Sequence, residues 1–290
     1  MIRIFVIGLM FFLASSATAS GKYTYSKADS VMVVRLLSEA KTMAEGENMV
    51  LFFARKFIGK PYVAHTLEVN SEEQLVINLR QLDCTTFVET VLALAMTAGE
   101  NKYSFKDYCD NLTKIRYNNG VIEDYSSRLH YFTAWITDNV EMGIVDEVKG
   151  SKALFSGLQT VDATYMTKHS DSYKMLAGNT AMIGKIALME KELCGQKYRY
   201  IPNNNIRNTQ ELRNVIHDGD VIAIVTNKKG LEISHLGFAV WKRDGLHLLN
   251  ASSLRHRVVE ESSTLRNYLI GRKTALGVRV LRFKLCGNRS

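Results

Sequence analysis

Cysteine is scarce in this sequence, and its spacing is irregular. The four cysteines, Cys84, Cys109, Cys194 and Cys286, are spread over a chain of 290 residues, and no C-x-x-C pair occurs. A zinc site is therefore not expected, and the pattern differs from the dense disulfide framework of small secreted domains. If one cysteine stays reduced for chemistry, at most one pair is left for a disulfide. The three later cysteines are otherwise expected as small buried apolar residues.

Three further features are missing: a long apolar run beyond residue 20, a block of like charge, and an internal repeat. Without such a run, no stable membrane insertion is expected. Lys and Arg number 37 against 29 Asp and Glu, which gives a formal net charge of +8. These cations form no basic stripe with interleaved aromatics, so nucleic-acid binding is not expected. The excess suits an anionic polymer or surface as partner, and general solubility explains it equally well.

The N-terminus has the pattern of a secretory signal peptide. An apolar run from Ile4 to Ala14 follows Arg3, and small residues ending at Ala19 come next. The run is too short for a transmembrane helix, and its A-x-A ending predicts cleavage after Ala19. We therefore expect residues 1–19 to direct export to the periplasm or the medium. The alternative is an uncleaved amphipathic anchor.

Apolar positions at helical spacing dominate the first half of the remaining chain. They predict five helices, at residues 27–44, 48–58, 84–98, 104–114 and 127–138. A short strand is expected near residues 74–80, and Pro61 ends the second helix because proline cannot continue it. A polar, weakly periodic region extends to about residue 215. We interpret that region as an insertion with loops.

The last quarter of the chain changes to segments rich in β-branched residues, separated by turn signals. Strands are predicted at residues 221–226, 233–241, 246–251 and 276–284. Helices first and strands later indicate an α+β fold, with N-terminal helices packed on one face of an antiparallel sheet. Residues 20–290 are expected to form a single catalytic domain, with helical and loop insertions at about 115–215.

Cys84 is the candidate nucleophile because it opens the predicted helix at 84–98. A cysteine at a helix N-terminus is favoured as the reactive thiolate by unpaired backbone N–H groups and the helix dipole. The N–H groups of Cys84 and Thr85 are also candidate donors to an oxyanion. Taken alone, a cysteine at a helix start is more often structural.

His235 and Asn250 are the candidates for activating such a thiol. Strand alternation places His235 on one face with Gly237 and Ala239. A face of such small residues lets a helix approach closely, so we expect the first turn of the Cys84 helix near the imidazole. Asn250, on the next strand, has a side-chain carbonyl able to orient that ring. The order Cys, His, Asn is papain-like, although each of the latter two is more often structural when considered alone.

Several motifs match a known superfamily. The motifs are LDCTTFVE at residues 82–89, GKPY at 59–62, SHLG at 234–237 and NAS at 250–252. Together they resemble the NlpC-like, papain-fold cysteine peptidases of the cell wall. LDCTTFVE and the block YSSRLHY at 125–131 are similar to the N-acetylmuramoyl-L-alanine amidase-like branch in particular. The resemblance extends from about Ala54 to Phe283.

The resemblance implies a function and roles for further residues. It implies hydrolysis of the amide between N-acetylmuramic acid and L-alanine in peptidoglycan fragments, without a metal or cofactor. A monomer is expected separately from the resemblance. Tyr62 matches the tyrosine that helps bind the oxyanion, and Asn250 falls where relatives carry a polar third residue, often His. The candidate substrate-binding residues are Asp83, Arg128, His130 and Tyr131.

Three alternatives remain open from the sequence. Two belong to the same fold: an endopeptidase that cuts between D-glutamate and the diamino acid of the stem peptide, or an acyltransferase. The third is a peptidoglycan-binding module without catalysis. The block at 125–131 also has an alternative interpretation. It fits the start of a helix equally well, and Leu129 and Tyr131 would then be core residues.

Overall fold

The computed structural model describes residues 23–284, so the expected signal peptide at 1–19 and Cys286 lie outside the described residues. Within this range the protein has a mixed α+β fold. The helices are α1 (Lys27–Ala40), α2 (Met49–Arg55), α3 (Cys84–Gly99), α4 (Phe105–Arg116), α5 (Phe132–Glu141), α6 (Tyr165–Lys168), α7 (Thr180–Leu193), α8 (Gln210–Val215) and α9 (Leu265–Ile270). The first four expected helices are confirmed, and the fifth begins five residues later than expected because residues 125–127 form a separate short turn of 3-10 helix.

Side-chain caps fix where the main helices begin. Ser26 and Asp29 form a reciprocal capping box at the start of α1, and Ser104 and Asp107 do the same at α4. Such boxes satisfy backbone N–H groups that have no partner inside the helix. The same device begins α3, where Asp83 and Thr86 form the box.

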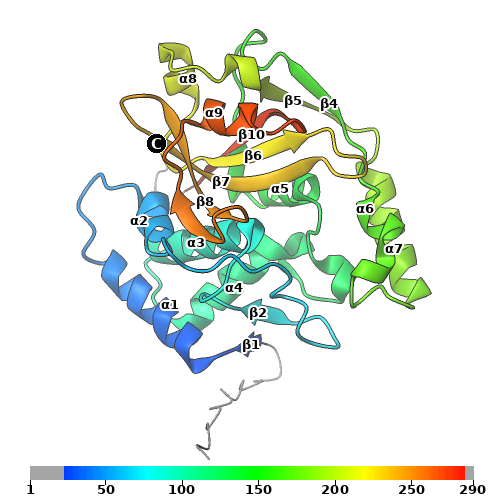
Figure 1. Cartoon of the computed structure of the whole chain (residues 1–290). Coiled ribbons are helices and arrows are strands. Elements are labelled where there is room, and N and C mark those ends of the chain that lie inside the picture. The colour runs from blue at the N-terminus through cyan, green and yellow to red at the C-terminus, as the bar shows by residue number, and fades with distance from the viewer. Residues whose placement is uncertain (1–22, 285–290) are drawn as a thin grey trace, which may run out of the picture.

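An eight-stranded antiparallel sheet forms the second layer (Figure 1). Its order is β4-β5-β10-β6-β7-β8-β9, and β3 also pairs with β10. The strands are β3 (Val145–Glu147), β4 (Gly157–Thr160), β5 (Lys197–Pro202), β6 (Val221–Thr226), β7 (Ile233–Trp241), β8 (Leu246–Ser252), β9 (Arg257–Glu260) and β10 (Ala275–Phe283). The four strands expected in the last quarter are confirmed as neighbours in this sheet. A separate parallel pair joins β1 (Tyr23–Tyr25) to β2 (Leu75–Ile77).

The region interpreted as an insertion with loops is more ordered than the sequence indicated. It contains the 14-residue helix α7 and three strands, and two of these strands pair with β10. The strand pattern is weak because each of these strands buries a single residue, which in β5 is Ile201. Edge and near-edge strands need little apolar surface, so they leave a faint signal.

The two faces of the sheet are covered by different helices (Figure 1). Leu236, Phe238 and Val240 of β7 pack with the N-terminal helices, whereas Ala239 packs with α8 and α9 on the other face. The alternation expected for β7 is therefore confirmed from Leu236 to Val240. The expectation that the face of small residues receives α3 is wrong, because α3 packs on the face of large ones. The helices also cover both faces, not one.

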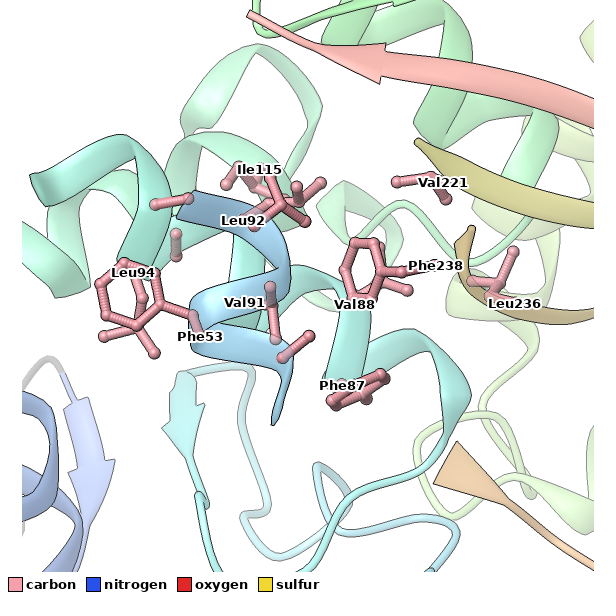
Figure 2. Packing of buried hydrophobic residues seen from close by; sticks show 14 of the residues in the cluster. Phe53, Phe87, Val88, Val91, Leu92, Leu94, Ile115, Val221, Leu236 and Phe238 are labelled. Atoms are coloured by element: carbon pink, nitrogen blue, oxygen red, sulfur yellow. The ribbon is translucent and has the colours of Figure 1, made fainter. Parts of the chain in front are cut away.

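Helix α3 is the centre of the larger core. Most of its residues are buried, and Figure 2 shows Phe87, Val88 and Val91 between Phe53 of α2 and Phe238 of β7. The Phe87 ring lies edge-on to Phe238, with centroids 5.4 Å apart. Aromatic pairs with this geometry stabilise beyond their buried area. Among the described residues, no helix has the length and apolar character needed to cross a membrane.

Phe87→Ala tests this packing. Phe87 is fully buried, so its truncation is expected to lower the free energy of unfolding by about 3–5 kcal/mol. Leu188→Ala, at a side chain that is 64% exposed, is the matched control and should change stability by less than about 0.5 kcal/mol. Urea denaturation measures both. Equal effects of the two substitutions would contradict the central place given to α3.

Candidate active site

The start of α3 is fixed by a capping box around Cys84. The carboxylate of Asp83 accepts from the backbone N–H of Thr86 at 2.8 Å, and the Thr86 hydroxyl accepts from the Asp83 N–H at 2.9 Å. Cys84 is thus the first residue of the helix. Because the cap uses the N–H of Thr86, the N–H groups of Cys84 and Thr85 are left at the helix end as donors.

The Cys84 thiol lies against strand β7. The backbone N–H of Leu236, the residue after His235, donates a hydrogen bond to the Cys84 sulfur. This bond and those from Thr85 stabilise the thiolate and so lower the pKa of Cys84. Burial raises the pKa of Cys84 and is the largest effect, and the negative charge of Asp83 raises it further. Together they outweigh the hydrogen bonds and raise the Cys84 pKa to about 12. A thiol in this state needs a base before it can attack.

His235 has a defined partner and a defined tautomer. Its Nε2 lies 2.8 Å from Oδ1 of Asn250, which is fully buried. The Asn250 amide nitrogen faces two acceptors, the carbonyl oxygen of Val259 at 3.5 Å and Oε1 of Glu261 at 3.4 Å. The amide oxygen therefore points to the imidazole, and Nε2 must carry the proton. The lone pair on Nδ1 is then the one free to act as a base.

The local geometry of β7 permits this contact. His235 pairs with Ile224 and Ile233 pairs with Val225, so Ser234 is the extra residue of a β-bulge. Bulges re-aim side chains and are frequent beside functional sites. Gly237 is equally constrained, because a Cβ there would lie 2.9 Å from the Cβ of Asn250 and 2.8 Å from a backbone oxygen. Only glycine lets the two strands bring His235 and Asn250 together.

The environment of His235 keeps its imidazole neutral. Burial lowers its pKa from the ordinary value of 6.5 and outweighs the hydrogen bond that the ring donates to Asn250, which raises the pKa. The charge of Arg272 lowers the His235 pKa further, while the charges of Glu261 and Asp83 raise it by less. Neutral imidazole is the form that accepts a proton from a thiol.

Tyr62 lies near Cys84 on an extended segment tied to elements on both sides. Its N–H donates to the carbonyl of His256 at 2.9 Å, and its neighbours Pro61 and Val63 bond to Leu82, each at 3.1 Å. Burial, and then the nearby Cys84 and Asp83, raise the Tyr62 pKa to about 12. Its hydroxyl therefore keeps its proton at neutral pH and can donate a hydrogen bond.

Three residues near the site were not expected from the sequence: Glu261, Tyr268 and Arg272. The Tyr268 ring, on α9, stacks on the His235 imidazole with centroids 6.3 Å apart, and the charge of Cys84 would act on its hydroxyl. Arg272 lies over that ring. The only local signal is the spacing of four between Tyr268 and Arg272, which fits a helical pair but does not indicate a site.

The candidate substrate-binding residues at 128–131 have structural partners instead. Arg128 is buried and forms ion pairs with Glu68 and Glu73, each at 3.0 Å. His130 bonds to the carbonyl of Tyr125 at 2.7 Å, and burial lowers its pKa to about 3.

Tyr131 is buried as well, and its hydroxyl donates to Glu190 of α7 at 2.7 Å. It therefore has no face free to cover a sugar, and Arg128 has no free charge for a substrate carboxylate. These contacts do not support the two expected roles, which stay predictions. Asp83 serves the helix cap described above.

The sequence of this domain matches one family over most of its length. The N-acetylmuramoyl-L-alanine amidase-like family matches residues 52–276. The chain belongs to this family. No match was found among curated proteins.

Solved structures of similar proteins agree with this family. An N-acetylmuramoyl-L-alanine amidase from Bacteroides uniformis is 38% identical, with a TM-score of 0.75, over 81% of this chain and 98% of that one. A Bacteroides fragilis protein provisionally named a xylanase is also 38% identical, with a TM-score of 0.73, over 79% and 98%. A Legionella pneumophila protein, 21% identical with a TM-score of 0.65 over 88% and 94%, shares the fold.

The charges around His235 predict the pH dependence of any amidase activity in this family member. The imidazole must be neutral to act as a base, and burial lowers its pKa. The acid limb of kcat/KM should therefore have its midpoint below pH 6.5. Glu261 raises the His235 pKa, so Glu261→Gln should move the limb to lower pH while the new amide still accepts from Asn250. A limb above pH 6.5, or one unmoved by the substitution, would contradict this electrostatic description.

Proposed function

We propose that this protein is a cysteine amidase that hydrolyses the amide between N-acetylmuramic acid and L-alanine in peptidoglycan fragments. Cys84 is the nucleophile, His235 the base and Asn250 the residue that orients it, in an arrangement of the papain and NlpC type. We also propose that residues 1–19 direct export to the periplasm or medium, and that the enzyme acts as a monomer without a cofactor.

One observation carries the mechanism. The Cys84 sulfur lies beside the N–H of Leu236, next to His235 in the chain, and the 2.8 Å contact between His235 and Asn250 leaves Nδ1 without a proton. A nucleophile, a base and an orienting group at one place are what covalent amide hydrolysis needs. The family match and the amidase among the solved structures support the substrate class.

In the first step the Cys84 thiol and the neutral imidazole react as an uncharged pair. Nδ1 of His235 takes the thiol proton as the sulfur attacks the amide carbonyl carbon. The resulting oxyanion accepts from the N–H groups at the start of α3 and from the Tyr62 hydroxyl. Burial raises the Cys84 pKa and lowers that of His235, and both shifts favour this neutral starting pair.

The second half of the reaction returns the enzyme. The imidazolium gives its proton to the nitrogen of L-alanine, and the C–N bond breaks, leaving a thioester on Cys84. Water then attacks the thioester with His235 again as base, and the muramic acid carboxylate leaves. The products are the free sugar acid and a stem peptide that begins with L-alanine.

The provisional xylanase name of one similar structure raises the question of glycoside hydrolysis. That reaction uses two carboxyl groups flanking the sugar bond. Two carboxylates act on His235: Asp83, which caps α3, and Glu261, which accepts from Asn250. Both are engaged with the protein, and the amide reaction accounts for the thiol and the imidazole as well.

Cys84→Ala tests the nucleophile. The variant removes only the sulfur at a capped helix start, so it should fold normally and release no product from muropeptides. His235→Ala should lower kcat by about 10²- to 10⁴-fold. Activity of the wild type should persist in EDTA. Mass spectrometry of the digest gives the readout: full activity of Cys84→Ala would refute the mechanism.

The same digest separates the alternatives. An intact stem peptide starting at L-alanine appears only if the sugar link is cut. Fragments that begin at the diamino acid indicate the endopeptidase, and transfer of the acyl group to an added amine indicates the acyltransferase. A binding module without catalysis would give no product from wild type or variant.

A further inference from the structure

Arg272 has an unusual position next to the proposed active site. It follows α9, where Gly271 ends the helix, and its guanidinium carbon lies 3.3 Å from the centroid of the Tyr268 ring. Its Nη1 donates to the backbone carbonyl of Tyr268 at 2.5 Å. The same tyrosine ring stacks on the His235 imidazole. The Tyr268 ring therefore lies against both the imidazole of His235 and the cation of Arg272.

The charge of Arg272 has no counter-charge within residues 23–284, since no carboxylate there lies within ion-pair distance of it. The buried arginines of the protein differ. Arg116 pairs with Glu89 at 2.7 Å, and Arg279 pairs with Glu147 at 2.6 Å. Arg272 is partly buried and close enough to His235 to disfavour the imidazolium. A bound anion would neutralise the Arg272 charge that disfavours the imidazolium. It would also accept hydrogen bonds from the free N–H groups of the guanidinium.

We propose that Arg272 binds a carboxylate of the stem peptide on the leaving-group side of the scissile amide. This inference rests on the proposed function. In a substrate that begins with L-alanine and D-glutamate, the first free carboxylate lies about two residues, roughly 7 Å, beyond the scissile nitrogen. Arg272 lies on that side of the site through a single ring, because its guanidinium contacts the Tyr268 ring that stacks on the His235 imidazole. A planar guanidinium recognises a carboxylate through two parallel hydrogen bonds.

Two matched ligands test this subsite: N-acetylmuramoyl-L-alanyl-D-glutamate with a free α-carboxylate, and the same molecule with an α-carboxamide. Binding is measured by calorimetry in the Cys84→Ala protein, which leaves the ligands uncut. The carboxylate ligand should bind about ten- to a hundredfold more tightly, as expected for charge-assisted hydrogen bonds. Adding Arg272→Gln should remove that preference, and Arg272→Lys should retain part of it.

A neighbouring arginine supplies the control. Arg266, on the helix α9 that precedes Arg272, donates to the carbonyl of Asn204 at 3.3 Å, and Arg266→Gln should leave the preference unchanged. Equal affinity for both ligands in the Cys84→Ala protein would overturn the proposal. So would an equal loss for both ligands in Arg272→Gln, because that result indicates a purely structural role through Tyr268.

Cleavage of the same two ligands by the active enzyme distinguishes this inference from the proposed function. If the wild type cuts the carboxylate ligand, Arg272→Gln should raise KM for it by about tenfold or more and change kcat little. If binding discriminates through Arg272 but no ligand is cut, the subsite stands and the amidase function is wrong. If the ligand is cut without discrimination, the function stands and the subsite is wrong.

Discussion

The packing of α3 against β7 is the constraint on which the candidate site depends. Phe87, in the first turn of the helix, contacts Phe238 on the strand, and the Asp83–Thr86 box fixes the residue at which the helix begins. Because both ends of this contact are rigid elements, the first residue of α3 is held against the backbone at Leu236. A site built in this way needs no flexible loop to position its sulfur.

The third residue sets the electrostatic character of the site. Asn250 is a neutral acceptor, so it fixes the orientation of His235 without the strong preference for imidazolium that a carboxylate in contact would give. The nearest carboxylate behind it, Glu261, contacts the amide nitrogen of Asn250. Its charge reaches the imidazole only from a distance. The balance of burial over these charges explains why the His235 pKa is lowered.

Much of this could be predicted from the sequence, and the failures have physical reasons. Cys84 at a helix start and the strand alternation around His235 are local patterns, set by helical and strand periodicity. Local strand alternation does not decide which face of β7 packs against α3. That choice depends on the surface buried between the two elements, and the large side chains of one face bury more than the small ones of the other. The sequence around Arg128 contains no obvious partner for its charge. Its two ion-pair partners, Glu68 and Glu73, lie more than fifty residues earlier in the chain. Tyr268 reaches the site only through the placement of α9, which no motif indicates.

The pKa of His235 also bears on which step of amide hydrolysis the site favours. An imidazole with a lowered pKa is a weaker base, so it removes the thiol proton less readily. The imidazolium formed by that transfer is correspondingly a stronger acid. Collapse of the tetrahedral intermediate must expel an amine, which leaves only if its nitrogen gains a proton. In the proposed mechanism, His235 beside Asn250 is therefore suited to the departure of L-alanine, the step that makes an amide harder to cleave than an ester.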